Sequence, residues 1–176
     1  KRNIKNVDLK NNRKNTWGTG LIFNHAIDSI QNVTVAAGFT REISESANNT
    51  AYYRNAYGLG LAYNFVHTTY GLDLERQVPK NQGDKRTKNE VRAIVRQGLN
   101  EDWNVYAMYA YKTDKQFGDT DRTRQFMVGT EYYVYNQGSL KVKPFLEWQA
   151  TRTKYENSTV DRSRDFKTVI GLRAYW

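Results

Sequence analysis

Strict alternation between two kinds of side chain constrains this chain more than any other feature. Residues 51–66 read AYYRNAYGLGLAYNFV, with large apolar side chains at most odd positions and small or polar ones at even positions. Successive side chains of a β-strand point to opposite faces of the sheet, so a period of two indicates a strand between two different environments. The segment predicts a long strand with one apolar and one polar face.

The same alternation recurs along the chain and predicts an all-β protein. A weak instance at 2–10 has only Val7 and Leu9 in step. The clear instances are 16–27, 33–43, 51–66, 69–78, 90–99, 103–113, 124–135, 140–153 and 164–176. Lengths of about 10–14 residues exceed the roughly 5–6 typical of soluble sheets and suit a tilted crossing of a bilayer. We expect one domain over residues 1–176, a transmembrane antiparallel up-and-down β-barrel with about ten strands visible.

The predicted connections between these strands alternate in length. Long, polar and charged connections are expected at 44–50, 79–89, 114–123 and 154–163. Short ones are expected at 28–32, 66–68, 100–102 and 136–139. Outer-membrane barrels sort their loops in this way, with short turns at one end and longer loops at the other. A soluble up-and-down barrel of the lipocalin type is the alternative.

The polar face carries many small residues, which favours its placement inside a barrel. They are Gly18, Gly20, Ala36, Gly38, Ala56, Gly58, Gly60, Ala62, Gly71, Ala110, Gly129 and Gly171. Glycine weakens a strand, so a solvated outer wall seldom needs so many, whereas a crowded inner wall does. On the other face, tyrosine and tryptophan lie near the strand ends, as in the aromatic girdles of membrane barrels. We predict that the apolar face meets lipid, with Trp17, Tyr53, Tyr70, Trp103, Tyr111 and Trp176 as interface anchors.

Composition narrows the classes of partner and site. The chain has no cysteine, which excludes disulfides and thiolate metal sites, and aromatic residues at 14% argue against disorder. Its formal net charge is +9, which favours anionic partners. The basic residues are spread over the loops and the polar face, and KRNIKNVDLKNNRK (residues 1–14) is the one dense run. We therefore expect contacts with the lipid bilayer and with anionic groups at its surface, and no nucleic-acid partner.

The C-terminal segment resembles a known family signal. It reads TVIGLRAYW, with large or apolar residues at alternate positions and an aromatic residue at the end. This resembles the C-terminal strand of Gram-negative outer-membrane proteins, although Ala174 stands where that family often has tyrosine. The resemblance implies location in the outer membrane and recognition by the barrel-assembly machinery through Ile170, Leu172, Ala174 and Trp176. It also implies contacts between basic external loops and lipopolysaccharide phosphates.

Two internal segments extend the resemblance to porins. WNVYAMYAYKTDK (103–115) and KVKPFLEWQATRTKY (141–155) are similar to sequences of general or oligosaccharide porins and of fusobacterial major porins. The resemblance implies passive diffusion of small hydrophilic solutes and ions, and a homotrimer is among the assemblies it allows. Either residues 2–10 close a ten-stranded barrel or the chain is the C-terminal portion of a larger barrel.

The polar face predicts the character of the channel. Its expected pore-lining residues are Arg54, Asp73, Glu75, Arg92, Arg96, Lys112, Glu131, Lys141, Lys143, Glu147, Lys167 and Arg173. With Glu42 added, eight basic residues face five acidic ones, which predicts a mild preference for anions. Arg173 is expected to face Glu147 or Glu131 in the channel. We expect no catalytic residue, cofactor or metal, because His25 and His67 fall at strand ends or turns. The alternative function is a non-conducting structural barrel or an adhesin that acts through its external loops.

Overall fold

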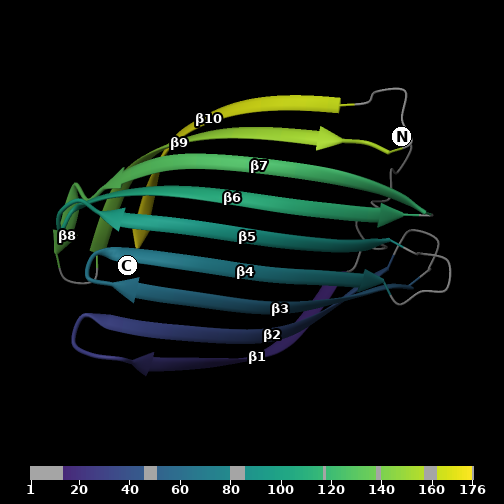
Figure 1. The fold of residues 1–176 in the computed structure, drawn as a ribbon, viewed down its shortest axis with the longest axis horizontal. Helices are drawn as coiled ribbons and strands as arrows, with labels where there is room; N and C mark the ends of the chain where they lie inside the picture. Colours follow the sequence, from purple (N-terminus) through teal and green to yellow (C-terminus); the bar gives the residue numbers. More distant parts are fainter. Residues whose placement is uncertain are drawn as a thin grey trace, which may run out of the picture.

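The computed structural model describes residues 14–45, 51–79, 86–116, 118–137, 140–156 and 162–175, and this part of the chain is all-β. Its strands form one antiparallel sheet in the order β1-β2-β3-β4-β5-β6-β7-β9-β10, with the short strand β8 paired to β9 (Figure 1). Each long strand lies beside its neighbour in sequence, so the predicted up-and-down arrangement is confirmed. Within the described ranges, no helix has the length and apolar character needed to cross a membrane.

The nine long strands have 12 to 15 residues each, and β8 has 3. Their bounds are β1 Lys14–Ala26, β2 Gln31–Glu45, β3 Ala51–Phe65, β4 Thr68–Pro79, β5 Thr87–Gly98, β6 Trp103–Gln116, β7 Asp119–Tyr132, β8 Tyr135–Gln137, β9 Leu140–Lys154 and β10 Arg162–Tyr175. The predicted weak strand at 2–10 lies outside the described residues.

The register places the predicted apolar positions side by side across the whole sheet. One continuous row of directly paired residues runs Phe23, Val35, Leu61, Leu72, Ala93, Tyr109, Phe126, Ala150 and Phe166. A slip of one residue in any strand would move that strand's apolar side chains to the opposite face. The common row therefore shows that the hydrophobic pattern sets one register for all nine long strands.

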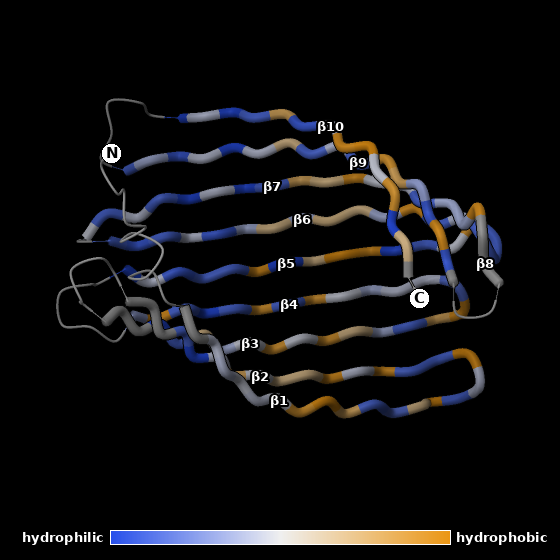
Figure 2. The backbone as a smooth tube through the Cα atoms, turned by 180° about the vertical axis from the view of Figure 1, so that it is seen from behind, coloured by the Kyte–Doolittle hydropathy of each residue, from blue (hydrophilic) through white to orange (hydrophobic). Residues whose placement is uncertain are grey.

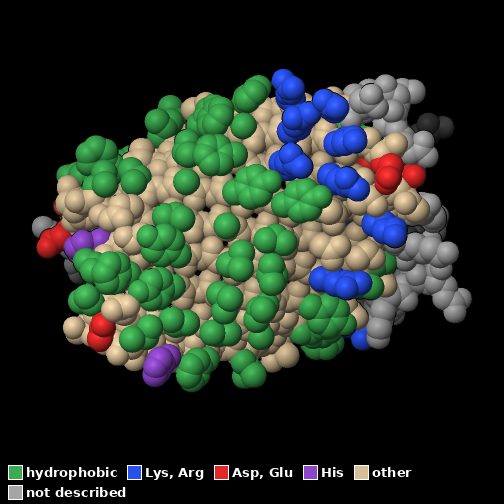
Figure 3. Space-filling model, viewed as in Figure 1, with side chains coloured by type: hydrophobic (Ala, Val, Ile, Leu, Met, Phe, Trp, Pro, Cys, Tyr) green, Lys and Arg blue, Asp and Glu red, His purple; other side chains and the backbone are tan. Residues whose placement is uncertain are grey.

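The sheet curls, and its two faces differ in crowding. Figures 1 and 2 show the ends of β1 and β10 bending to the same side of the sheet. Ala110 and Lys143 on the polar face are buried, at 0% and 6% exposed, whereas Leu61 and Leu146 on the apolar face are 41% and 45% exposed. The polar face is thus the crowded, concave one, and the apolar face is convex (Figure 3). A soluble barrel of the lipocalin type has the reverse arrangement.

The sheet has two open edges within the described part of the chain. β1 pairs only with β2, and β10 pairs only with β9. Large apolar side chains on these edge strands are strongly exposed, with Leu21 at 81% and Ile170 at 79%. Of the predicted barrel, the described residues therefore supply a curled antiparallel wall in which β1 and β10 are not joined.

The strands at one end extend further than the sequence predicted. The expected loop 114–123 is mostly strand, because β6 runs to Gln116 and β7 begins at Asp119. The register pairs Asp114 with Asp121 there. Both faces of this hairpin are polar, so hydropathy gives no period of two to reveal the strands. Figure 2 shows the same blue, hydrophilic strand ends along that side of the sheet, which we call the long-loop end. The opposite side is the short-turn end.

Gly118 turns the chain between β6 and β7 with a φ of 102°, a conformation that side-chain-bearing residues rarely adopt. No atom lies within 4 Å of the place where a Cβ would stand, so any cost of substitution comes from the backbone alone. Gly118→Ala should lower the free energy of unfolding by about 1–2 kcal/mol. Urea titration of both proteins measures this change, and equal stability would contradict the turn geometry.

Candidate functional site on the concave face

The structure places all twelve predicted pore-lining residues on the concave face of the sheet. Strand alternation and register together give this placement, from Arg54 on β3 to Arg173 on β10. The structure divides the twelve into a cluster near the short-turn end, a second cluster near the long-loop end, and several cations outside both.

The first cluster surrounds Glu131 on β7, whose side chain is 2% exposed. Its Oε1 accepts a hydrogen bond from Nζ of Lys143 on β9 at 3.2 Å. Its Oε2 accepts one from Nη1 of Arg173 on β10 at 3.2 Å, and Arg96 on β5 also pairs with the carboxylate. Three cations from three different strands therefore converge on one buried carboxylate, with an intervening strand between Glu131 and both Arg96 and Arg173. Such reach across a strand is available only on the concave face.

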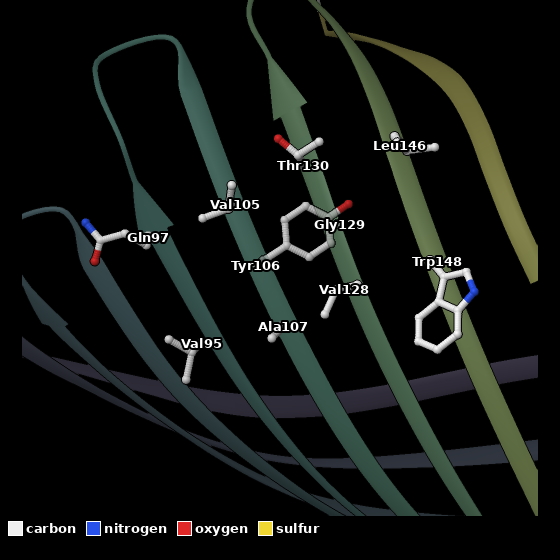
Figure 4. Close-up of a pocket in the computed structure, with 10 residues that line it drawn as sticks. All are labelled: Val95, Gln97, Val105, Tyr106, Ala107, Val128, Gly129, Thr130, Leu146 and Trp148. Carbon is white, nitrogen blue, oxygen red and sulfur yellow. The ribbon is translucent and has the colours of Figure 1, made fainter.

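Tyr106 extends the Glu131 cluster by crossing a neighbouring strand. Its hydroxyl, on β6, donates to Oε1 of Glu147 on β9 at 2.6 Å, although β7 lies between the two strands. Nη2 of Arg173 donates to the same oxygen at 2.5 Å. The tyrosine ring lies over Gly129 of β7 (Figure 4), where an added Cβ would stand 2.5 Å from its Cζ. Glycine at this position lets the ring pass, which explains the small residue that the sequence analysis placed on the polar face.

Phe145 and Gly171 repeat this arrangement one strand further along. A Cβ at Gly171 on β10 would lie 2.6 Å from Cζ of the Phe145 ring on β9. The guanidinium carbon of Arg173 lies 4.1 Å from the centroid of the same ring. Crowding of the polar face is thus found at Gly129 and Gly171. A Cβ at Gly38 or Gly58 would instead stand 3.8 Å or more from any neighbouring atom.

The second cluster surrounds Asp114 at the long-loop end, and the sequence analysis missed most of it. Arg86 Nη2 donates to Asp114 Oδ2 at 2.6 Å, and Lys88 Nζ lies 3.6 Å from the same oxygen. Glu90 pairs with Lys112 at 3.3 Å and with Arg92 at 3.5 Å. Asp114, Arg86 and Lys88 fall in segments predicted as loops, so their common face could not be read. The sequence gives only a weak signal for a strand here, a run in which both sets of alternate positions are polar, as in TKNE at 87–90.

Lys141 and Lys167 differ from the clustered cations. Both lie on the concave face of β9 or β10, and both are exposed. Neither forms an ion pair with another described residue. A paired cation is largely neutralised by its partner, whereas an unpaired one acts at full strength on mobile ions. These two lysines therefore contribute most directly to the net field in front of the wall.

The predicted interface anchors lie on the convex face wherever their side chains are described. Trp17, Tyr70 and Trp103 are 52%, 49% and 44% exposed, and Tyr111 is half-buried. Nε1 of Trp103 donates to Thr130 Oγ1 at 2.6 Å, which fixes the ring at the short-turn end. The side chains of Tyr53 and Trp176 lie outside the described residues.

A shallow apolar groove of about 490 Å³ lies over β5, β6, β7 and β9 (Figure 4). Its lining is almost entirely apolar and comes largely from outward positions: Val95, Val105, Ala107, Val128, Leu146 and Trp148. Its shape and chemistry suit a hydrocarbon chain, since grooves that bind apolar ligands are lined in the same way.

The two histidines stand apart from both clusters. His25 stacks beside Phe23 at 6.3 Å between ring centroids, and His67 is exposed in the turn after β3. The chemistry on the concave face is therefore that of fixed charges of both signs. No protein-family model and no curated protein sequence matches this chain.

Proposed function

We propose that this sheet is part of the wall of a β-barrel porin in the outer membrane of a Gram-negative bacterium. The pore passes small hydrophilic solutes and ions by passive diffusion, with a mild preference for anions. The observation that carries the proposal is the separation of the two faces. Apolar residues form one continuous row on the convex side, in which seven of the nine side chains are exposed, and all twelve charged residues predicted to line the pore lie on the concave side.

The dimensions of the apolar face support a bilayer environment. On β3 the outward apolar side chains run from Tyr57 to Phe65. At about 3.3 Å per residue this is roughly 26 Å of strand, or about 20 Å of height at a tilt of roughly 40°. Membrane barrels carry an apolar band of about 25 Å. Large exposed apolar surfaces are rare on soluble monomers, and aromatic residues border this one at both ends.

Closure of the barrel requires strands beyond those described. In a bilayer the free backbone groups of β1 and β10 have no water to bond, and each unsatisfied group costs several kcal/mol. Further pairing from residues outside the described ranges, or from another chain such as the copies of a homotrimer, removes this cost. The exposed Ile170, Leu172 and Ala174 on β10 also support recognition of this edge strand by the barrel-assembly machinery.

Anion preference in this proposal rests on the unpaired cations of the wall. Changing Lys141 and Lys167 together to glutamate should reverse the selectivity from anions to cations, because four units of charge change in front of the pore wall. Reversal potentials in planar bilayers under a KCl gradient measure this directly. The matched control is the double change Arg76→Glu and Lys115→Glu, which alters outward-facing, exposed residues by the same charge.

The control should retain the selectivity of the parent protein. Stable conductance steps with an unchanged reversal potential in the Lys141 and Lys167 variant would contradict the assignment of these residues to the lumen. If the parent protein inserts into the bilayer and gives no conductance steps, the proposal that it forms a pore is refuted.

The Glu131 cluster favours the second candidate, a non-conducting barrel that acts through its external loops. Salt bridges that reach across strands fill space in front of the wall, and a barrel of about eight strands has an interior just wide enough for side chains. Inserted protein that stays electrically silent would favour this candidate.

A further inference from the structure

Six basic side chains form a compact group on the convex face at the long-loop end, and the pore proposal makes no use of them. They are Arg122 and Arg124 on β7, Arg152 and Lys154 on β9, and Arg162 and Arg164 on β10. All six are exposed. Figure 3 shows basic side chains gathered over the ends of these strands. We call this group the basic grid.

The register arranges the basic grid in two rows of directly opposed like charges. Arg122 pairs across the sheet with Lys154, and Lys154 with Arg162. In the next outward row, Arg124 pairs with Arg152, and Arg152 with Arg164. Directly opposed side chains on one face have Cβ atoms about 4.5–5.5 Å apart, and like charges in this position destabilise a sheet. Six cations at this spacing favour an anion that lies over them.

The described protein itself does not supply that anion. None of the six side chains makes a hydrogen bond or ion pair with another described residue. Asp121 and Asp165 lie on the same strands but at positions that face the concave side. Glu156 lies beyond the end of β9, where its carboxylate accepts a hydrogen bond from the backbone of Thr120. Within β7, β9 and β10 themselves, the acidic residues at this end therefore face the concave side and the six basic residues face the convex side.

The basic grid borders the apolar face directly. The next outward row toward the short-turn end contains Phe126, Ala150 and Phe166, and Tyr111 stands beside Arg124 in the grid's own second row. Phe126 and Phe166 both pack on Trp148, with ring centroids 6.5 Å and 6.1 Å apart. A ligand that satisfies both rows must carry anionic groups at one level and hydrocarbon immediately beneath them. A lipid with a phosphorylated headgroup has this arrangement, whereas a double-stranded nucleic acid has no hydrocarbon to cover the aromatic row.

We propose that the basic grid is a binding site for phosphorylated lipid in the leaflet at the long-loop end, with the phosphates over Arg124 and Arg152 and the acyl chains over Phe126 and Phe166. In an outer membrane that lipid is the phosphorylated glycolipid. Arginine supplies five of the six cations, and its planar donors bind phosphate oxygens in pairs. The proposal rests on the membrane location proposed above, but it does not depend on whether the barrel conducts.

The test measures lipid binding by the full chain in nonionic detergent, with diphosphoryl lipid A as the probe and native mass spectrometry as the readout. Arg124→Gln with Arg152→Gln should weaken binding about 25-fold. Each basic residue at an anionic surface contributes about 1 kcal/mol, and 1.4 kcal/mol is tenfold. The matched control is Arg76→Gln with Lys141→Gln, which removes the same charge elsewhere and should stay within about twofold of the parent. Arg124→Lys with Arg152→Lys should retain most of the binding.

Further measurements decide which ligand binds and what a loss of binding means. Inorganic phosphate and a 20-nucleotide single strand should each bind far more weakly than the lipid, and equal or tighter binding of either would overturn the lipid assignment. Equal lipid binding by the parent and the Arg124/Arg152 glutamine variant would overturn the site. That variant should fold as stably as the parent, because it relieves like-charge repulsion, and its conductance should be unchanged. If the parent protein does not conduct but still binds lipid through the basic grid, the pore proposal is refuted and the lipid-binding site is not.

Discussion

Replacing Glu131 with glutamine should lower the free energy of unfolding by about 3–5 kcal/mol, the usual cost of leaving a buried charge without its partner. Glutamine keeps the size of the side chain but removes the charge on which Arg96, Lys143 and Arg173 converge. Lys143 is affected most, because its side chain is only 8% exposed and cannot recover hydration by a small movement. Urea titration of the detergent-solubilised protein, followed by tryptophan fluorescence, measures the change.

Two companion variants separate the loss of charge from the loss of packing. Asp73→Asn removes the same charge from an exposed carboxylate, 3.9 Å from Arg92, and should cost less than about 1 kcal/mol. Adding Lys143→Gln to the Glu131 variant should restore part of the lost stability, since the buried ammonium that has lost its bond to Glu131 is then gone. If Glu131→Gln proves as mild as Asp73→Asn, the buried cluster is not a stabilising feature of the fold.

Adding a single methyl group at Gly129 should also be costly. The new Cβ would stand within 2.5–2.7 Å of three atoms of Tyr106, so the ring must swing away from β7. The tyrosine hydroxyl then loses its 2.6 Å hydrogen bond to Glu147. Overpacking and the loss of a bond to a charged group together should lower the free energy of unfolding by about 2–4 kcal/mol. Thermal or urea unfolding of Gly129→Ala tests this value.

Gly38→Ala is the matched control for this change. A Cβ there would lie 3.8 Å from its nearest neighbour, so the variant should be as stable as the parent or slightly more stable, because glycine weakens a strand. In a background of Tyr106→Ala, the extra methyl group at Gly129 should cost almost nothing. Equal losses with and without the tyrosine ring would show that the strain lies elsewhere.

Sequence reasoning reached the strands and their faces because each strand separates two unlike environments. The period of two at 51–66 is strong enough by itself to assign Leu61 to the apolar face, where its paired neighbours also lie. The same reasoning missed the parts of the strands at the long-loop end. There Asp114 pairs with Asp121, and both faces of the two strands are polar. Hydropathy carries no information when both sides of a strand are equally polar.

The candidate site was predicted mainly as a face. The one contact predicted across it, of Arg173 with Glu147 or Glu131, is confirmed, because Arg173 pairs with both. Alternation put Arg96, Glu131 and Arg173 on one side, but their convergence depends on how strongly the sheet curls across β5–β10. Tyr106 was missed for the same reason, since its partner lies two strands away. The basic grid did leave a signal, because a basic pair spaced by two residues occurs at 122, 152 and 162. Only the register shows that the three pairs stand side by side.

The crossing of Tyr106 over Gly129 has a mechanical consequence for the wall as a whole. It ties β6 to β9, while Arg96 and Arg173 tie β5 and β10 to β7, so these strands are braced beyond their backbone hydrogen bonds. In β1–β4 the described side-chain hydrogen bonds, such as Thr34 Oγ1 to Asn24 Oδ1 at 2.7 Å, join neighbouring strands. Among the described contacts, ties between strands that are not neighbours therefore occur in the half of the sheet from β5 to β10. A load on that half would be shared among several strands and would not fall on a single pair.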